Sequence, residues 1–186
     1  MLWAPRSVYA VYLATSGVYV STLTANYALS ITSGLVVGAK GLLTHTTNYA
    51  SQVYITSITA NYAIISGTLN VSGKGFAAGQ GQGTCSNTGS YGGESGNCSG
   101  FTYGSSTGPV QIGSGGGNAG GGAVLLTVAT NLTLNGSILA ESAATGAVNG
   151  TGSGGSLYIQ AASLLGGGTL GASAGRGQAT AMGGMV

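Results

Sequence analysis

Few residues in this chain could carry acid–base or nucleophilic chemistry. It contains no aspartate, one histidine (His45) and two glutamates (Glu94 and Glu141). Glycoside hydrolysis needs two carboxyl groups roughly 5–10 Å apart, and the two glutamates lie in separate parts of the sequence. A histidine that acts as a general base is commonly oriented by a carboxylate, and no aspartate is present to orient His45. We therefore expect His45 to be an ordinary surface histidine and the protein not to be an enzyme.

The sequence predicts neither a metal site nor a nucleotide site. One histidine and two cysteines are too few for a tetrahedral zinc site, and calcium-binding glycine-rich repeats require aspartate, which is missing. Gly73-Lys74-Gly75 lacks the spacing of a phosphate-binding loop and the serine or threonine that follows its lysine. We therefore expect no cofactor.

Asparagine supplies a modification signal. Because serine and threonine are abundant, chance alone predicts about two or three Asn-x-Ser/Thr acceptor sequences. The chain has five, at Asn70, Asn97, Asn131, Asn135 and Asn149. Asn135-Gly136 is also a natural turn sequence without any sugar. The excess predicts N-linked glycans, and glycine-rich surroundings favour Asn97 and Asn149 as occupied sites.

The two cysteines, Cys85 and Cys98, lie in a segment rich in glycine, serine and asparagine. They are either two unrelated thiols or a local disulfide. The disulfide is favoured because flexible glycines on both sides let the two Cα atoms approach the ~5.5 Å that the bond needs. Closing a loop of this size would stabilise the fold by about 3 kcal/mol in the chain-entropy model.

The composition excludes several classes of protein. Charged residues make up 3% of the chain, against roughly 25% in an average domain. A net charge of +2 forms no basic patch, so we expect no nucleic-acid partner. The hydrophobic content of 43% argues against disorder. No apolar run approaches the ~20 residues of a membrane-spanning helix.

Both ends of the sequence suggest that the chain is a fragment of a longer precursor. The first residues, Met1 to Arg6, lack the charged-then-apolar order of a signal peptide. The last residues, Gly183 to Val186, stop inside glycine-rich sequence.

Two internal repeats run along the chain. Residues 18–28 and 53–63 are identical or closely similar at every position. Residues 126–138 align more weakly with residues 158–170, and a glycine cluster precedes each copy. Repetition at about 30 residues is typical of solenoids, in which each unit stacks on the one before.

The local pattern indicates short β-strands. Residues 54–59 and 132–134 mix β-branched and polar side chains, and glycine interrupts every candidate helix. We therefore predict an all-β fold, a right-handed parallel β-helix (β-solenoid) with glycine-rich turns and one long glycine-rich excursion. Residues 1–72 and 123–186 would hold the repeats of one continuous domain, and residues 73–122 the excursion, closed by Cys85 and Cys98.

The glycine-rich part of the chain resembles a known repeat family. It is similar to the glycine-rich β-helix repeats of large secreted surface proteins of protists, algae, plants and bacteria. The resemblance covers residues 70–175 and lies in residues 72–76, 90–93, 103–105, 113–117, 120–123, 134–138, 152–159 and 168–170. It implies an extracellular structural role, for example in a filament such as a flagellar hair (mastigoneme), and it assigns no functional residue.

The N-terminal tyrosines have two interpretations. They are either half-buried packing residues with the hydroxyl at the rim or an aromatic row that contacts other subunits or glycans. The first is favoured for the set Tyr9, Tyr12, Tyr19, Tyr27, Tyr49, Tyr54 and Tyr62.

Two functions compete on this basis. The first is an extracellular structural glycoprotein of a surface filament or coat, whose partners are copies of itself and other surface glycoproteins. Its open solenoid ends would stack. The second is an adhesin or another carbohydrate- or surface-binding module. Hydroxyl-bearing strands at residues 21–24, 44–46 and 56–59 are too few and irregular for an ice-binding array.

Overall fold

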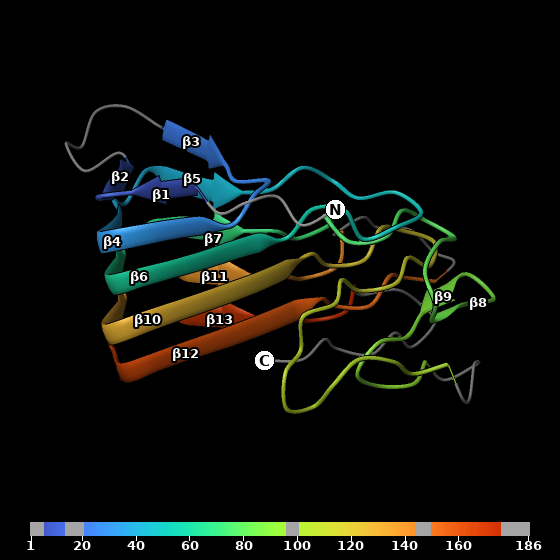
Figure 1. The fold of residues 1–186 in the computed structure, drawn as a ribbon. Helices are drawn as coiled ribbons and strands as arrows, with labels where there is room; N and C mark the ends of the chain where they lie inside the picture. The colour runs from blue at the N-terminus through green and yellow to red at the C-terminus, as the bar shows by residue number, and fades with distance from the viewer. Residues whose placement is uncertain (1–5, 14–20, 96–100, 144–149, 176–186) are drawn as a thin grey trace.

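The computed structural model describes residues 6–13, 21–95, 101–143 and 150–175. All elements of regular secondary structure in these residues are β-strands. The strands form a six-stranded parallel sheet, a five-stranded parallel sheet and a two-stranded antiparallel pair (Figure 1). The predictions of an all-β protein and of parallel pairing are therefore confirmed. The described part of the chain contains no helix long and apolar enough to cross a membrane.

The two large sheets face each other. The long-strand sheet contains β1 (Arg6–Val8), β2 (Val11–Leu13), β4 (Leu29–Val37), β6 (Thr56–Ile65), β10 (Ala123–Leu134) and β12 (Ser156–Leu165). The short-strand sheet contains β3 (Ser21–Thr24), β5 (Gly41–Thr44), β7 (Thr68–Asn70), β11 (Ser137–Leu139) and β13 (Thr169–Gly171). From β4 onwards the strands of these two sheets alternate along the chain, which is consistent with a β-solenoid.

We refer to the two stacked sheets as the solenoid, and its hydrophobic core lies between them. In β10, Leu126 and Val128 are buried and Thr127 between them is exposed, as expected of a strand with one buried face. Because the pairing is parallel, each buried side chain lies beside its equivalent in the next coil. Ile58, Leu126 and Ile159 form one such column.

Glycine recurs where the chain turns from a long strand into a short one. A Cβ atom added at Gly136 would overlap the carbonyl oxygen of Gly67 in the preceding coil, and one added at Gly67 would overlap that of Gly38. The same backbones are hydrogen-bonded, since the Ser137 N–H donates to the Gly67 carbonyl at 3.0 Å. Glycine is required here because the stacked backbones leave no space for a side chain.

The first sequence repeat is not the repeat of the structure. Residues 21–24 form β3 in the short-strand sheet, whereas their counterparts, residues 56–59, begin β6 in the long-strand sheet. Local composition favours a strand but does not decide which sheet receives it.

The second repeat is confirmed over its C-terminal part. Leu132 pairs with Leu164 and Ser137 with Thr169, as the alignment predicts. Before Asn131 the alignment is wrong by one residue, because the register shifts between Val128 and Asn131. A β-bulge places two residues of one strand opposite one of its partner.

The segment between β7 and β10, which the sequence predicts as an excursion, adds no strand to either large sheet within its described residues. We call its described residues, 73–95 and 101–122, the glycine-rich lobe. It extends beyond the ends of the strands (Figure 1) and contains the antiparallel pair β8 (Thr84–Cys85) and β9 (Thr88–Gly89). Backbone bonds join its segments: the Gly75 N–H donates to Gly120 at 2.8 Å, and the Phe76 N–H to Gly113 at 3.0 Å.

Candidate functional site: the open ends of the solenoid

The last coil, β12 and β13, has a strand neighbour on one side only within the described residues. Leu164 in β12 pairs with Leu132 in β10. Leu132 is 0% exposed, whereas Leu164 is 57% exposed. The same core position is therefore buried inside the solenoid and open at its end.

Other core columns end in the same way at this coil. Ile159, Ala161 and Leu170 are only partly buried, although their register partners in β10 and β11 are buried core residues. Natural sheets protect exposed edges with charges, prolines or bulges. β12 and β13 contain neither a charged residue nor a proline. Within the described residues, this end therefore offers two parallel edges without charges or prolines and an apolar face between them.

The opposite end is open as well. Val8 in β1 is 37% exposed, whereas its partner Ile31 in β4 is 3% exposed. Val11, Leu13 and Leu23 are partly buried and pack against the same core. The guanidinium of Arg6 lies 4.6 Å from the centre of the Tyr27 ring, which places this positive charge over an aromatic face.

Both ends present parallel strand edges and partly exposed apolar side chains. Inside the molecule, each coil contacts the next through parallel strand pairing and through apolar side chains that lie in the same column. The edges of β12 and β13 expose the same kinds of backbone groups and apolar side chains. The first strands at the other end also expose them, facing the opposite direction. The arrangement can therefore bind another solenoid by strand addition.

The predicted glycosylation sites lie in different environments. Asn131 is exposed in β10, and Asn135 is exposed in the turn that follows. Asn70 is half-buried at the end of β7, and its side-chain oxygen accepts a hydrogen bond from the Ser72 N–H at 2.8 Å. Asn97 and Asn149 lie outside the described residues. Glycan attachment stays a prediction at all five sites.

Of the two cysteines, Cys85 lies in β8 and is half-buried. Cys98 lies outside the described residues, so the Cys85–Cys98 disulfide stays a prediction.

The prediction of a surface histidine is wrong. His45 is 1% exposed, because the alternation of β5 continues past its end and turns the imidazole inward. The ring nitrogen Nδ1 lies 2.8 Å from the Thr46 carbonyl oxygen, and Nε2 has no hydrogen-bond partner in the described part of the chain. Burial lowers the pKa of His45; the Thr46 carbonyl opposes this and the nearby charge of Lys74 adds to it.

The space for this imidazole depends on a glycine. A Cβ atom at Gly122 would lie 2.5 Å from Nε2 of His45. Here the glycine-rich lobe joins β10, so the histidine fills a gap at the boundary between the lobe and the solenoid.

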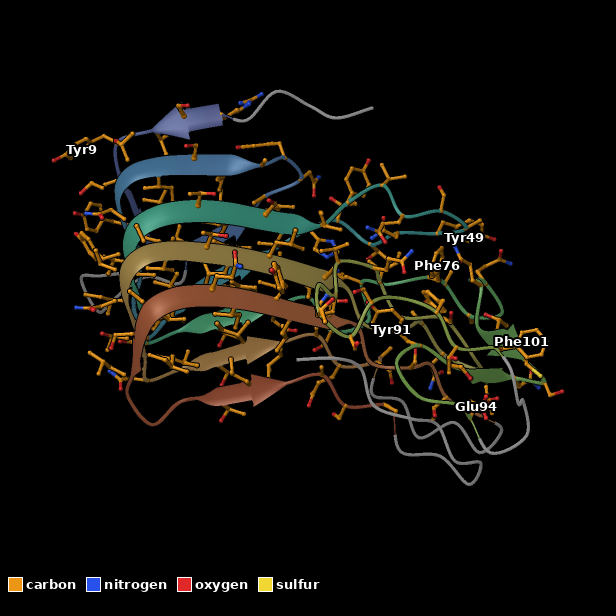
Figure 2. The ribbon with its side chains drawn as sticks, turned by 60° about the horizontal axis from the view of Figure 1, so that its bottom comes forward. Tyr9, Tyr49, Phe76, Tyr91, Glu94 and Phe101 are labelled. Carbon is orange, nitrogen blue, oxygen red and sulfur yellow. The ribbon has the colours of Figure 1, made fainter. Side chains whose placement is uncertain are left out.

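The two glutamates lie in separate elements. Glu94 is exposed in the lobe, where Figure 2 shows it far from the sheets. Glu141 follows β11 and accepts a hydrogen bond from the Ser173 hydroxyl at 2.8 Å. No group of three or more potential metal ligands occurs within the residues that the structure describes.

The N-terminal tyrosines divide between the two interpretations. Tyr9, Tyr12 and Tyr49 are exposed, whereas Tyr27, Tyr54 and Tyr62 are half-buried, and Tyr19 lies outside the described residues. The Tyr62 ring occupies the space over Gly34 in β4. A hydrogen bond with Tyr62 raises the pKa of Tyr12, so these two phenols meet across the neighbouring strand.

Comparison of the chain with protein-family models, curated proteins and solved structures found no match, so the resemblance to glycine-rich β-helix repeats stays a prediction.

Proposed function

We propose that this chain is a non-catalytic structural subunit of an extracellular filament or coat that assembles by head-to-tail stacking of its β-solenoid. The contrast between Leu132 and Leu164, which hold equivalent positions but differ from 0% to 57% in exposure, supports this proposal most directly. Covering the apolar columns of the last coil with the first coil of another copy would remove this surface from water.

Head-to-tail contacts do not close on themselves unless a rotation brings the ends together, and they otherwise produce open filaments. Each described copy would add five strands, β3, β5, β7, β11 and β13, to a continuous short-strand sheet. With a strand spacing of about 4.8 Å, the axial repeat would be about 24 Å.

The remaining parts of the proposal rest on general rules and on the sequence. We propose a right-handed solenoid, because crossover connections between parallel strands are right-handed in about 98% of cases. The five acceptor asparagines and the two cysteines favour an extracellular glycoprotein. A flagellar hair is one filament of this kind, and other surface glycoproteins are candidate partners.

Assembly of the purified chain tests the proposal. Electron microscopy and fibre diffraction should show filaments with strands perpendicular to the axis and the axial repeat given above. Leu164→Glu places a charge at the open end, where the side chain already meets solvent and folding should persist. Thr127→Glu is the matched control, because Thr127 is exposed on β10, which has a strand neighbour on both sides.

We expect Leu164→Glu to abolish filaments while Thr127→Glu forms them normally. Circular dichroism would verify that both variants are folded. A chain that stays monomeric at all concentrations, or filaments that form equally well from Leu164→Glu, would contradict stacking through this end.

A further inference from the structure

The glycine-rich lobe contains a cavity that the stacking proposal does not use. Its volume is about 520 Å³, within the range of roughly 300–1,000 Å³ that is usual for ligand pockets. Three amide side chains, two aromatic rings and a serine contribute to its lining: Gln52, Gln82, Gln111, Phe76, Tyr103 and Ser51. The cavity lies between the lobe and the loop that precedes β6.

The Tyr103 ring in this cavity is held from several directions. Its hydroxyl donates to the Ile112 carbonyl at 2.7 Å and accepts from the Ser114 hydroxyl at 2.8 Å. The Tyr91 ring lies behind it, with 4.8 Å between the ring centres and an angle of 51° between the planes. Burial raises the pKa of Tyr103, so the phenol is neutral at physiological pH. The aromatic surface is therefore positioned before any ligand arrives.

Of the three side-chain amides, one is hydrogen-bonded within the protein and two are available to a ligand. Gln52 donates to the Val110 carbonyl at 3.1 Å and accepts from the Ile112 N–H at 3.0 Å. The side-chain amides of Gln82 and Gln111 line the cavity and have no hydrogen-bond partner among the described residues. Each of these two amides can both donate and accept.

We propose that this cavity binds a neutral carbohydrate. None of the lining residues is charged, so an ionic ligand would find no partner of opposite charge. A purely apolar ligand would leave the Gln82 and Gln111 amides unpaired, which costs free energy. Sugar hydroxyls both donate and accept, as these amides do, and the C–H face of a sugar ring packs against an aromatic ring such as Tyr103.

Two sources could supply this ligand. One is a neutral N-glycan on a neighbouring copy of the chain, and the other is a polysaccharide from the surroundings. Both present the same hydroxyl and C–H groups, and the cavity forms within one copy, so the proposal does not depend on filament assembly.

Saturation-transfer NMR on the full chain tests the proposal. The probes are an oligomannose N-glycan and neutral trisaccharides of glucose, galactose, mannose and N-acetylglucosamine, each also presented with a sulfated analogue. The test variant is the double substitution Gln82→Ala and Gln111→Ala, which removes side chains without partners and should leave the fold intact. Gln160→Ala, an exposed glutamine in β12, is the matched control.

We expect at least one neutral probe to bind, with at least a tenfold loss of affinity in the double variant and no change in Gln160→Ala, since two hydrogen bonds are lost. Binding of the N-glycan alone would indicate a neighbouring copy as the source, and binding of the free trisaccharides a polysaccharide. The absence of binding, equal binding by the double variant, or a preference for sulfated probes would overturn the proposal.

Discussion

The solenoid and the glycine-rich lobe are stabilised in different ways. In the solenoid, leucine, isoleucine and valine side chains stack in columns between two sheets. In the lobe, many of the buried residues are glycines, and the peptide groups of adjacent loops bond directly. The Gly113 N–H donates to Gly121 at 2.8 Å, and the Gly121 N–H donates to Ser153 at 3.0 Å. Packed apolar side chains fill the core of the solenoid, whereas backbone hydrogen bonds between adjacent loops connect the segments of the lobe.

The difference shows how a segment with few large side chains can be ordered. Glycine lets two backbones approach within hydrogen-bonding distance because no Cβ atom separates them. The hydrophobic cluster of the lobe is small: Phe76 and Ile112 pack with Ala123 at the start of β10. Hydrogen bonds, each of which contributes about 1 kcal/mol net, therefore add to this cluster and to the packing of the buried Tyr91 against Tyr103.

A core truncation in the solenoid should have the largest effect. Leu126 is fully buried in the central column of β10. Leu126→Ala should lower the free energy of unfolding by about 2–5 kcal/mol through lost burial and a cavity. Leu165→Ala, at an exposed leucine of β12, is the control and should change it by less than about 1 kcal/mol. Urea unfolding measures both, and equal effects would show that the columns are not the source of stability.

The second test concerns the loop that contacts the lobe. Asn48 is buried and its amide makes four bonds: it accepts from the N–H groups of Val53 (2.7 Å) and Tyr54 (2.8 Å) and donates to the carbonyls of Tyr54 (2.8 Å) and Lys74 (2.9 Å). Asn48→Ala should cost about 2–3 kcal/mol because it removes four hydrogen bonds made by one buried side chain. Asn61→Ala, in a second Asn-Tyr-Ala sequence but exposed, should stay within about 0.5 kcal/mol of the parent in the same assay.

The third test asks whether close backbone approach stabilises the lobe. A Cβ atom at Gly113 would overlap the Gly154 carbonyl oxygen and lie 2.7 Å from that of Ser153, whereas a Cβ atom at Gly108 would meet nothing within 4 Å. Gly113→Ala should cost about 1–3 kcal/mol and speed amide hydrogen exchange in the lobe. Gly108→Ala should have almost no effect. If both variants exchange at the parent rate, the lobe does not depend on this contact.

The smallest effect should appear only in acid, at the boundary between the two regions. Because burial lowers the pKa of His45, the folded chain binds a proton there more weakly than the unfolded chain does. The contribution to stability is complete above the ordinary histidine pKa of about 6.5 and is lost as the pH falls toward the lowered value.

Urea unfolding of the parent and of His45→Gln between about pH 7.5 and 5 measures this contribution. The parent should lose more stability than the variant on acidification, because only the parent carries the imidazole. Parallel pH profiles for the two proteins would show that His45 does not titrate with folding.

Several features of the fold could be predicted from residue types alone. Alternation in segments such as residues 132–134 predicts strands, and glycine after β6 and β10 predicts turns. The alignment of Leu132 with Leu164 also gives the correct register. The alignment fails at Leu126, because a β-bulge between Val128 and Asn131 shifts the pairing of everything before it. Nothing in the local pattern marks the extra residue.

The candidate site was only partly predictable. The Asn-x-Ser/Thr sequences predict glycans, and the internal repeats predict stacking. The open end has no sequence signal, because equivalent positions look alike whether or not another coil covers them, as Leu132 and Leu164 show. The cavity of the lobe gave no sequence signal, because Gln52, Phe76 and Tyr103 are far apart in the chain.

Residue types and short spacings were enough to predict the strand-forming segments, the turn glycines and the scarcity of groups for acid–base chemistry. The folded chain alone placed each segment in its sheet, buried His45 beside Gly122 and paired the backbones of the glycine-rich lobe. This difference arises because every residue carries the same peptide group. Backbone pairing between distant loops therefore depends on how the chain is arranged in space rather than on any local pattern of side chains.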